Sequence, residues 1–176
     1  MIWAGFRRYN SFGFFIMNNL SRGHEMSYGA ARYEQIVAKL EAAGHRITPQ
    51  RLCIVEALLA SDRHPSAEEI FAQVRLISPT TSLATIYKTL DTLKSLGEVL
   101  EVESWDNRTH FDGLRPSPHP HIVCTGCGRI DDIDLQGVSA LQSEAERVSG
   151  FKVDEQRLEF YGRCLKCQET TAANMA

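Results

Sequence analysis

Residues 82–103 read SLATIYKTLDTLKSLGEVLEVE, and within them the hydrophobic pattern changes from that of a helix to that of a strand. Ser82 is a typical helix N-cap, and Gly97 is a typical helix stop. Between them one apolar stripe recurs at helical spacing, formed by Leu83, Ile86, Leu90, Leu93 and Leu96. After Gly97, residues 99–103 alternate as a strand does. The stretch therefore predicts an amphipathic helix followed directly by a strand.

Three shorter helices are predicted before this one. The first extends from Ala31 to Gly44, and the second begins at Thr48-Pro49 and extends to Leu59. Ser66 and Glu69 form a capping box that opens the third, which ends near residue 77. Residues 99–103 and 109–111 are predicted to pair as a hairpin around the polar turn 105–108. This order of elements is typical of a winged helix-turn-helix DNA-binding domain over residues 30–111.

A second, smaller unit is predicted over residues 121–168. The segment 112–120 holds Pro116, Pro118 and Pro120, so we expect it to be a hinge. Strands are predicted at 121–124, 129–133, 151–153 and 157–161, with a helix capped by Asp134 between the second and the third. The expected fold class is α+β, with a small α/β dimerisation domain after the hinge. Residues 169–176 are expected to be a tail. Residues 1–29 show no period and are expected to be a disordered extension, with Met17 and Met26 as alternative starts.

The composition favours a folded chain and gives little general support for nucleic-acid binding. Hydrophobic residues make up 43% and charged residues 23%. No apolar run reaches the ~18 residues that a membrane span requires. The net charge is −3, and residues 30–111 carry 9 Lys and Arg against 11 Asp and Glu. DNA binding would therefore depend on a few well-placed cations.

Four of the five cysteines form two C-x-x-C pairs, Cys124 with Cys127 and Cys164 with Cys167. Four thiolates suit tetrahedral Zn²⁺ and leave no position for a substrate, so this pattern predicts a structural zinc site. A redox dithiol is the alternative, although it would need only one pair. The fifth cysteine, Cys53, lies between Leu52 and Ile54 and is expected to be a small core residue. We expect a cytoplasmic protein, and in that compartment paired cysteines usually bind metal rather than form a disulfide.

A second candidate metal site combines imidazoles and carboxylates. His119 and His121 are two residues apart, so on an extended chain they point to the same side. Asp112 lies upstream and Asp132 downstream, and carboxylates shift the preference from zinc toward Mn²⁺ or Fe²⁺. Histidines exposed in a proline-rich loop would give the same pattern, so spacing alone leaves both interpretations open.

The helix after Ser82 is the candidate DNA-reading helix. The face opposite its leucine stripe is predicted to carry short hydroxyls, an aromatic ring and a lysine, which suit phosphates and thymine methyl groups. Ser82 begins this helix, and Arg51 at the start of the second helix could reach a phosphate or be a plain surface residue. The remaining candidates on the face are Thr85, Tyr87, Lys88, Thr89 and Thr92.

Together these stretches resemble the ferric uptake regulator family of metal-dependent repressors, over about residues 30–168. The residues that carry the resemblance are the stretches 46–51, RITPQR; 64–70, HPSAEEI; 82–87, SLATIY; 157–162, RLEFYG; and the segment from His119 through the first cysteine pair.

The resemblance implies a homodimer whose winged-helix heads bind a palindromic operator in double-stranded DNA. It also implies that His64 joins Asp112, His119, His121 and Asp132 around one regulatory Fe²⁺ or Mn²⁺. Aspartate at both carboxylate positions, Asp112 and Asp132, resembles the pattern of the peroxide-sensing branch of this family. In that branch Fe²⁺ reacts with hydrogen peroxide and oxidises a ligating histidine, here His64 or His119. Gln136 and Gln156 stand where some relatives have further ligands, so no additional site is expected.

Three alternatives to a peroxide-responsive repressor stay open on the sequence. One is an iron- or manganese-uptake regulator that uses the same cluster without oxidation. A metalloenzyme is another, although no nucleophile with its base is evident. The third is a zinc-stabilised interaction module.

Overall fold

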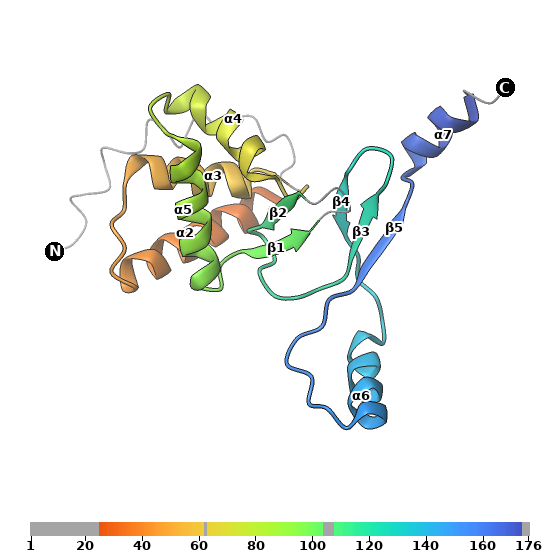
Figure 1. Cartoon of the computed structure of the whole chain (residues 1–176). Helices are drawn as coiled ribbons and strands as arrows, with labels where there is room; N and C mark the ends of the chain where they lie inside the picture. Colours follow the sequence, from red (N-terminus) through yellow and green to blue (C-terminus); the bar gives the residue numbers. More distant parts are fainter. Residues whose placement is uncertain (1–24, 62, 104–107, 174–176) are drawn as a thin grey trace.

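The computed structural model describes residues 25–173 except residues 62 and 104–107. Four helices form one end of the molecule: α2 (Glu25–Ala42), α3 (Pro49–Leu59), α4 (Ala67–Ile77) and α5 (Leu83–Ser95). They enclose a core of aliphatic side chains in which Ile36, Ile54, Ile70, Ile86 and Leu93 have no exposed surface. The hairpin β1 (Leu100–Glu103) and β2 (Thr109–Asp112) follows as an antiparallel pair (Figure 1). The predicted winged helix-turn-helix is confirmed.

The predicted helix caps form as hydrogen bonds. Thr48 accepts from the backbone N–H of Arg51, and Ser82 accepts from that of Thr85. Ser66 and Glu69 form the complete capping box that opens α4. These local contacts explain why helices α3, α4 and α5 begin where the sequence predicted.

The first helix was predicted too short. Helix α2 begins at Glu25, so residues 25–29, assigned to a disordered extension, are helical. Tyr28 ties this end down by donating a hydrogen bond to the carbonyl of Leu114, 3.2 Å away. Residues 1–24, with the alternative start at Met17, lie outside the described residues, as does most of the predicted turn 105–108.

The rest of the chain forms a three-stranded sheet in the order β4-β3-β5. Strand β3 (His121–Cys124) pairs antiparallel with β4 (Ile130–Asp132) and parallel with β5 (Glu159–Gly162). Val102 of the hairpin packs with Val123 and Ile130 of this sheet in a small second core. The helical end and the sheet are thus joined by apolar contact as well as by the chain.

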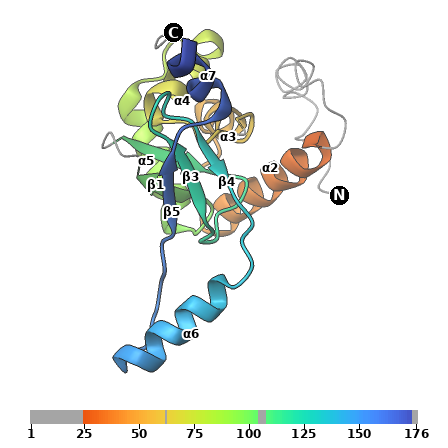
Figure 2. The same ribbon diagram turned by 90° about the vertical axis from the view of Figure 1, so that its right-hand side faces the viewer.

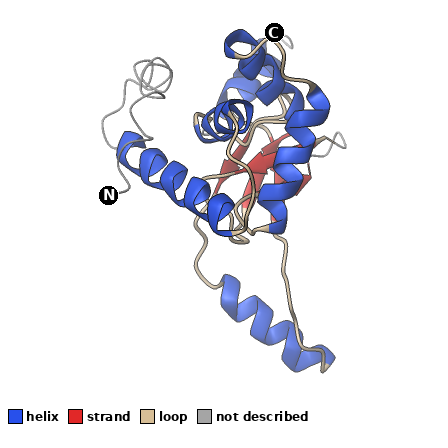
Figure 3. Cartoon of the chain, turned by 90° about the vertical axis from the view of Figure 1, so that its left-hand side faces the viewer, coloured by secondary structure: helices blue, strands red, loops and turns tan. Residues whose placement is uncertain are grey.

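Helix α6 (Val138–Ser149) projects away from both parts, as Figures 2 and 3 show from opposite sides. None of its residues is buried. Its apolar stripe is therefore open, with Leu141 60% and Val148 70% exposed. A helix with a wide bare apolar face calls for a partner surface.

Four predictions in this second part were wrong. Asp134 does not cap α6, because the chain reaches the helix through Gly137 in a left-handed conformation with φ 86°. Residues 151–153 form no strand, and β5 starts two residues later than predicted. An unpredicted helix, α7 (Leu165–Ala173), takes up most of the expected tail. Along the described part of the chain, no helix is both long and apolar enough to cross a bilayer.

Candidate metal centres

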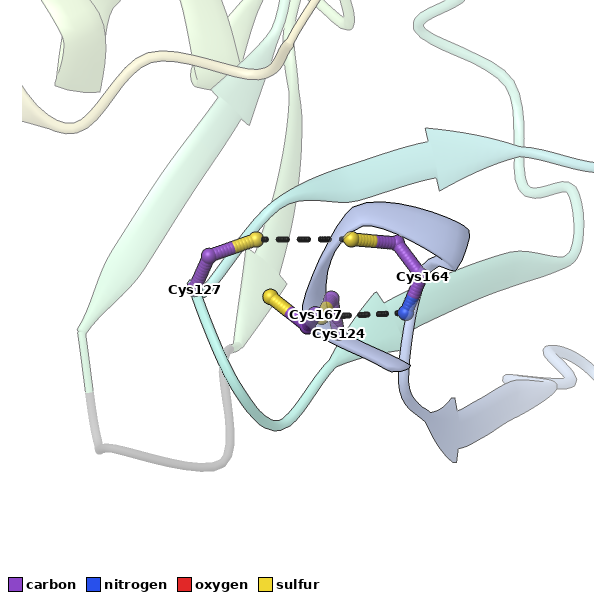
Figure 4. A group of neighbouring side chains, drawn as sticks. All are labelled: Cys124, Cys127, Cys164 and Cys167. Atoms are coloured by element: carbon purple, nitrogen blue, oxygen red, sulfur yellow. Dashed lines mark hydrogen bonds between the residues drawn. The ribbon is translucent and has the colours of Figure 1, made fainter. Parts of the chain in front are cut away.

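The four paired cysteines converge at one end of the sheet (Figure 4). Cys124 ends β3, Cys127 lies in the turn to β4, Cys164 follows β5, and Cys167 lies in α7. Their sulfur atoms all lie within 4.8 Å of one another, and the Cys127 and Cys164 sulfurs are 3.9 Å apart. A tetrahedral zinc ion with Zn–S bonds of about 2.3 Å requires sulfurs about 3.8 Å apart. The cluster therefore has the size that zinc needs.

Two glycines allow the turn to close around these sulfurs. A Cβ atom on Gly126 would lie 3.0 Å from both Cβ and Sγ of Cys167, so a side chain there would push this cysteine away. Gly128 has φ +74°, a left-handed conformation that other residues rarely adopt.

The electrostatics of the cysteine cluster also fit a cation. The backbone N–H of Cys164 donates to the Cys124 sulfur and lowers the pKa of that thiol to about 6, although burial opposes this. By contrast, the neighbouring thiols of Cys164 and Cys127 raise the pKa of Cys167 to about 12. One thiolate thus makes deprotonation of the next cysteine unfavourable, and a bound divalent cation would offset the repulsion between the two negative charges.

The five residues of the second predicted site also come together, from four separate segments. Asp112 ends β2, His119 lies in the loop between β2 and β3, His121 starts β3, and Asp132 ends β4. His121 and Asp132 are direct partners in the β3–β4 register. His64 lies just before α4, and one donor atom from each of the five residues lies within 4.8 Å of the others.

His64 is held in place by strand β2. Its backbone adopts a left-handed conformation with φ 49°, which is uncommon for residues other than glycine. The ring Nδ1 of His110 lies 2.7 Å from the carbonyl oxygen of His64, and the N–H of Phe111 donates to the Pro65 carbonyl. These contacts keep the imidazole aimed at the sheet.

The donor atoms that face one another have no hydrogen-bond partners. They are Nε2 of the three histidines, Oδ2 of Asp112 and Oδ1 of Asp132, all buried. Asp132 Oδ1 lies 2.8 Å from His64 Nε2 and 2.9 Å from His119 Nε2. Buried polar atoms left unpaired are costly, so this arrangement fits an ion that would bind all five.

The protonation states of His121 and Asp112 suit a divalent metal, whereas that of His64 competes with one. Burial lowers the pKa of His121, and the His119 and His64 rings lower it further to about 4, so this imidazole is neutral. Burial raises the pKa of Asp112, but His64 and the N–H groups of Arg115 and Leu114 outweigh it and leave the pKa lowered. Burial lowers the pKa of His64, whereas Asp112 and Asp132 outweigh this and leave it raised, so a metal must displace the proton of this ring when it binds. A mixed set of three imidazoles and two carboxylates suits Fe²⁺ or Mn²⁺.

The structure separates the predicted DNA-contact residues into two groups. Ser82, Tyr87 and Lys88 are exposed on α5, and Thr85 is half-buried beside them. Thr89, however, is 2% exposed and donates its hydroxyl proton to the Thr85 carbonyl, so the prediction that it faces DNA was wrong. It occupies the position between Ile86 and Leu93 on the stripe that packs on the core.

The other predicted residues take ordinary places, and two further residues support the metal sites. Arg51 donates to the Arg46 carbonyl at 2.6 Å, and Cys53 packs against the core. Two supporting residues were not predicted from the sequence: His110, which holds His64, and Arg115, which contacts both aspartates. Nothing in local spacing distinguishes these two from other polar residues of a loop or hairpin.

Comparison with known proteins agrees with this arrangement. The profile of the Ferric uptake regulator family matches residues 42–161. A peroxide-responsive repressor, PerR, of Staphylococcus aureus is 38% identical over 136 residues, which cover 77% of this chain and 91% of that protein.

Two solved structures show the same similarity in three dimensions. A peroxide stress regulator of Campylobacter jejuni is 33% identical with a TM-score of 0.58, covering 76% of this chain and 97% of its own. A zinc-bound manganese uptake regulator is 26% identical with a TM-score of 0.61, covering 74% and 98%. The chain therefore belongs to the ferric uptake regulator family and is a metal-binding transcriptional regulator, not an enzyme.

Proposed function

We propose that this protein is a cytoplasmic, dimeric, metal-dependent repressor that senses peroxide through iron-catalysed oxidation of His64 or His119. The observation that carries the proposal is the five-donor site in which both carboxylates are aspartates with one oxygen aimed inward. Bound Fe²⁺ would supply the chemistry that transfers oxygen from peroxide to a neighbouring imidazole. Mn²⁺ would bind the same residues and support DNA binding without that reaction.

The position of the site explains how a metal would control DNA binding. His64 and Asp112 belong to the winged-helix end, whereas His121 and Asp132 belong to the sheet. An ion bonded to all of them would fix the orientation of the helical end relative to the sheet. Binding would then favour one orientation of α5 over the others, which is a shift of population between conformations. Oxidation of a histidine would weaken the link and release that orientation.

The DNA-reading surface that we propose is the exposed face of α5. Lys88 supplies the cation, Tyr87 an aromatic edge, and Ser82 and Thr85 short hydroxyls. Two such helices in a dimer would bind two half-sites of a palindromic operator about one turn of DNA apart.

The dimer surface that we propose is the open apolar face of the sheet and α6. Large hydrophobic side chains are exposed there on several segments, and exposed apolar surface of this kind indicates an interaction surface. They are Ile122 and Phe160, which are paired on β3 and β5, and Leu141, Val148 and Phe151, which lie in or directly after α6.

Mass spectrometry of intact protein and its peptides tests the proposal directly. Protein loaded with Fe²⁺ without oxygen should gain one oxygen atom on His64 or His119 after a small dose of peroxide. The Mn²⁺-loaded protein should not. His110 is a matched control, because it contacts the backbone of His64 but is not among the five donors. Oxidation spread equally over His110 would indicate a diffusing oxidant and would contradict the proposal.

A metal-level sensor is the second candidate, favoured by the similarity to a manganese uptake regulator. Such a protein would use the same five donors and bind DNA according to metal concentration alone. An iron-filled site whose histidines stay unoxidised under peroxide would favour this candidate.

A further inference from the structure

Each carboxylate of the histidine–aspartate site has one oxygen aimed at the imidazoles and one oxygen held outside the site. In Asp132, Oδ1 faces His64 and His119, while Oδ2 lies 3.5 Å from Nη1 of Arg115. In Asp112, Oδ2 faces His64 at 3.5 Å, while Oδ1 accepts the backbone N–H groups of Leu114 and Arg115 at 2.8 and 2.9 Å. Both aspartates are thus arranged to offer a single ligand atom.

Arg115 contacts the outer oxygen of both carboxylates. Its backbone N–H binds Asp112 and its guanidinium binds Asp132. The second arm of the guanidinium donates to Asp134 Oδ1 at 3.1 Å. Asp134 is 88% exposed at its side chain and lies outside the metal cluster, so it serves as an anchor for the arginine. The rigid fork of an arginine suits such a simultaneous contact with two carboxylates.

We propose that Arg115 is a positioning residue that keeps Asp132 turned to bind the regulatory metal through Oδ1 alone. The inference rests on the function proposed above, because it assigns a role toward the same ion. Without the guanidinium, the Asp132 carboxylate could rotate and offer both oxygens or move toward solvent. Partners of this kind behind a metal ligand typically change metal affinity 10- to 100-fold when removed.

Simple electrostatics predicts the opposite change in metal affinity when Arg115 is removed, so the two explanations can be distinguished. A guanidinium beside a divalent cation repels it, so removal of the positive charge alone would tighten metal binding. Loss of positioning would weaken it. The sign of the change in affinity therefore separates the two effects.

The test uses the full-length, zinc-loaded protein and titrates it with Mn²⁺. We expect Arg115→Gln to weaken Mn²⁺ binding about tenfold, and Arg115→Lys, which keeps the charge but not the fork, to weaken it less. The electron paramagnetic resonance spectrum of bound Mn²⁺ should change in both variants, because the carboxylate ligand changes its mode of binding. A general loss of stability would not produce that spectral change in a fully loaded site.

Arg129→Gln is the matched control. Arg129 lies beside β4 and binds Asp131 at 2.7 Å, and Asp131 is not among the five donors. This variant removes one positive charge from the same edge of the sheet and should leave the affinity unchanged or slightly tighter, with an unchanged spectrum.

The outcomes distinguish this inference from the function on which it rests. Unchanged or tighter Mn²⁺ binding in Arg115→Gln, together with a wild-type spectrum, would overturn the role of Arg115 alone. His121→Ala is the reference variant for the site itself. If Mn²⁺ binding were equally strong in His121→Ala, the proposed site would be wrong, and the role of Arg115 would be overturned with it.

Discussion

Asp132 Oδ1 lies 2.8 Å from His64 Nε2, and the two residues come from different parts of the molecule, the sheet and the helical end. His64 precedes α4, the third helix of the winged-helix end, and Asp132 ends an outer strand of the sheet. No backbone hydrogen bond of a helix or sheet joins these two residues, so only their side chains connect the two parts here. Through this contact, metal binding would change the orientation of the DNA-reading helix α5.

The first prediction concerns this contact. His64→Ala should weaken Mn²⁺ binding at least about tenfold and should remove the metal dependence of operator binding, because the helical end loses its ligand. Zinc content should stay unchanged, since the cysteines lie elsewhere. Gel-shift assays with and without Mn²⁺, alongside metal analysis, measure both effects. Operator binding that still responds to Mn²⁺ at wild-type concentrations would contradict the proposed coupling.

The second prediction concerns the cysteine cluster. Cys124→Ser should release zinc and lower the unfolding temperature strongly, because structural zinc supplies on the order of 10 kcal/mol of folding free energy. Zinc per chain and thermal unfolding measure this. Cys53→Ser is the control, since Cys53 is remote from the cluster, and it should retain zinc. A zinc-free Cys124→Ser protein as stable as the wild type would refute a structural role.

The third prediction concerns DNA recognition. Tyr87→Ala should weaken operator binding about tenfold through loss of an exposed contact on α5. Thr89→Val should have no comparable effect, because Thr89 is buried and faces the core. Operator affinity measured at saturating Mn²⁺ separates the two variants. Equal losses in both would show that α5 meets DNA with another face.

The fourth prediction concerns the bare apolar face. Leu141→Lys should turn the dimer into a monomer, because a charge on this face of α6 would be buried without a partner in the dimer interface. Leu76→Lys, an equally drastic change at an 86% exposed leucine of α4, should leave the dimer intact. Analytical ultracentrifugation distinguishes the outcomes. A Leu141→Lys dimer of wild-type strength would place the interface elsewhere.

The fifth prediction concerns a buried ion pair between α2 and the end of α5. Glu98, 4% exposed, binds Arg32 and Lys39, and Arg32 also donates to the Gly113 carbonyl at 2.9 Å. Glu98→Gln should cost about 3 kcal/mol of stability at pH 7, because it leaves the Arg32 charge buried and uncompensated.

The pH dependence of that cost follows from the pKa of Glu98. Burial raises it, but Lys39 and Arg32 outweigh burial and hold it below the ordinary value of 4.5. The stabilisation is therefore fully present above about pH 4.5 and is lost as the pH falls through the lowered pKa. Denaturant unfolding of both proteins at pH 7 and near pH 4 should show the difference narrowing in acid. A difference that stays constant would exclude an ionised Glu98 as its source.

Some features of the fold were predictable because they depend on neighbours in the chain. The caps at Thr48, Ser66 and Ser82 each satisfy N–H groups within three residues, so the sequence shows them directly. The burial of Thr89 could also have been predicted from its spacing in the helix. It lies three residues after Ile86 and four before Leu93, on the stripe itself, and its hydroxyl obscured that pattern.

By itself, the sequence determined the helical core, the hairpin and the two sets of metal-binding residue types, because periodicity, caps and ligand chemistry are local properties. The tertiary structure decided which distant donors meet. It brought His64 to Asp132 across two packed parts, and it placed Arg115 behind both carboxylates. It also left α6, which the chain reaches through Gly137, without a single buried residue. Contacts between remote segments depend on packing, and packing is a property of the whole chain.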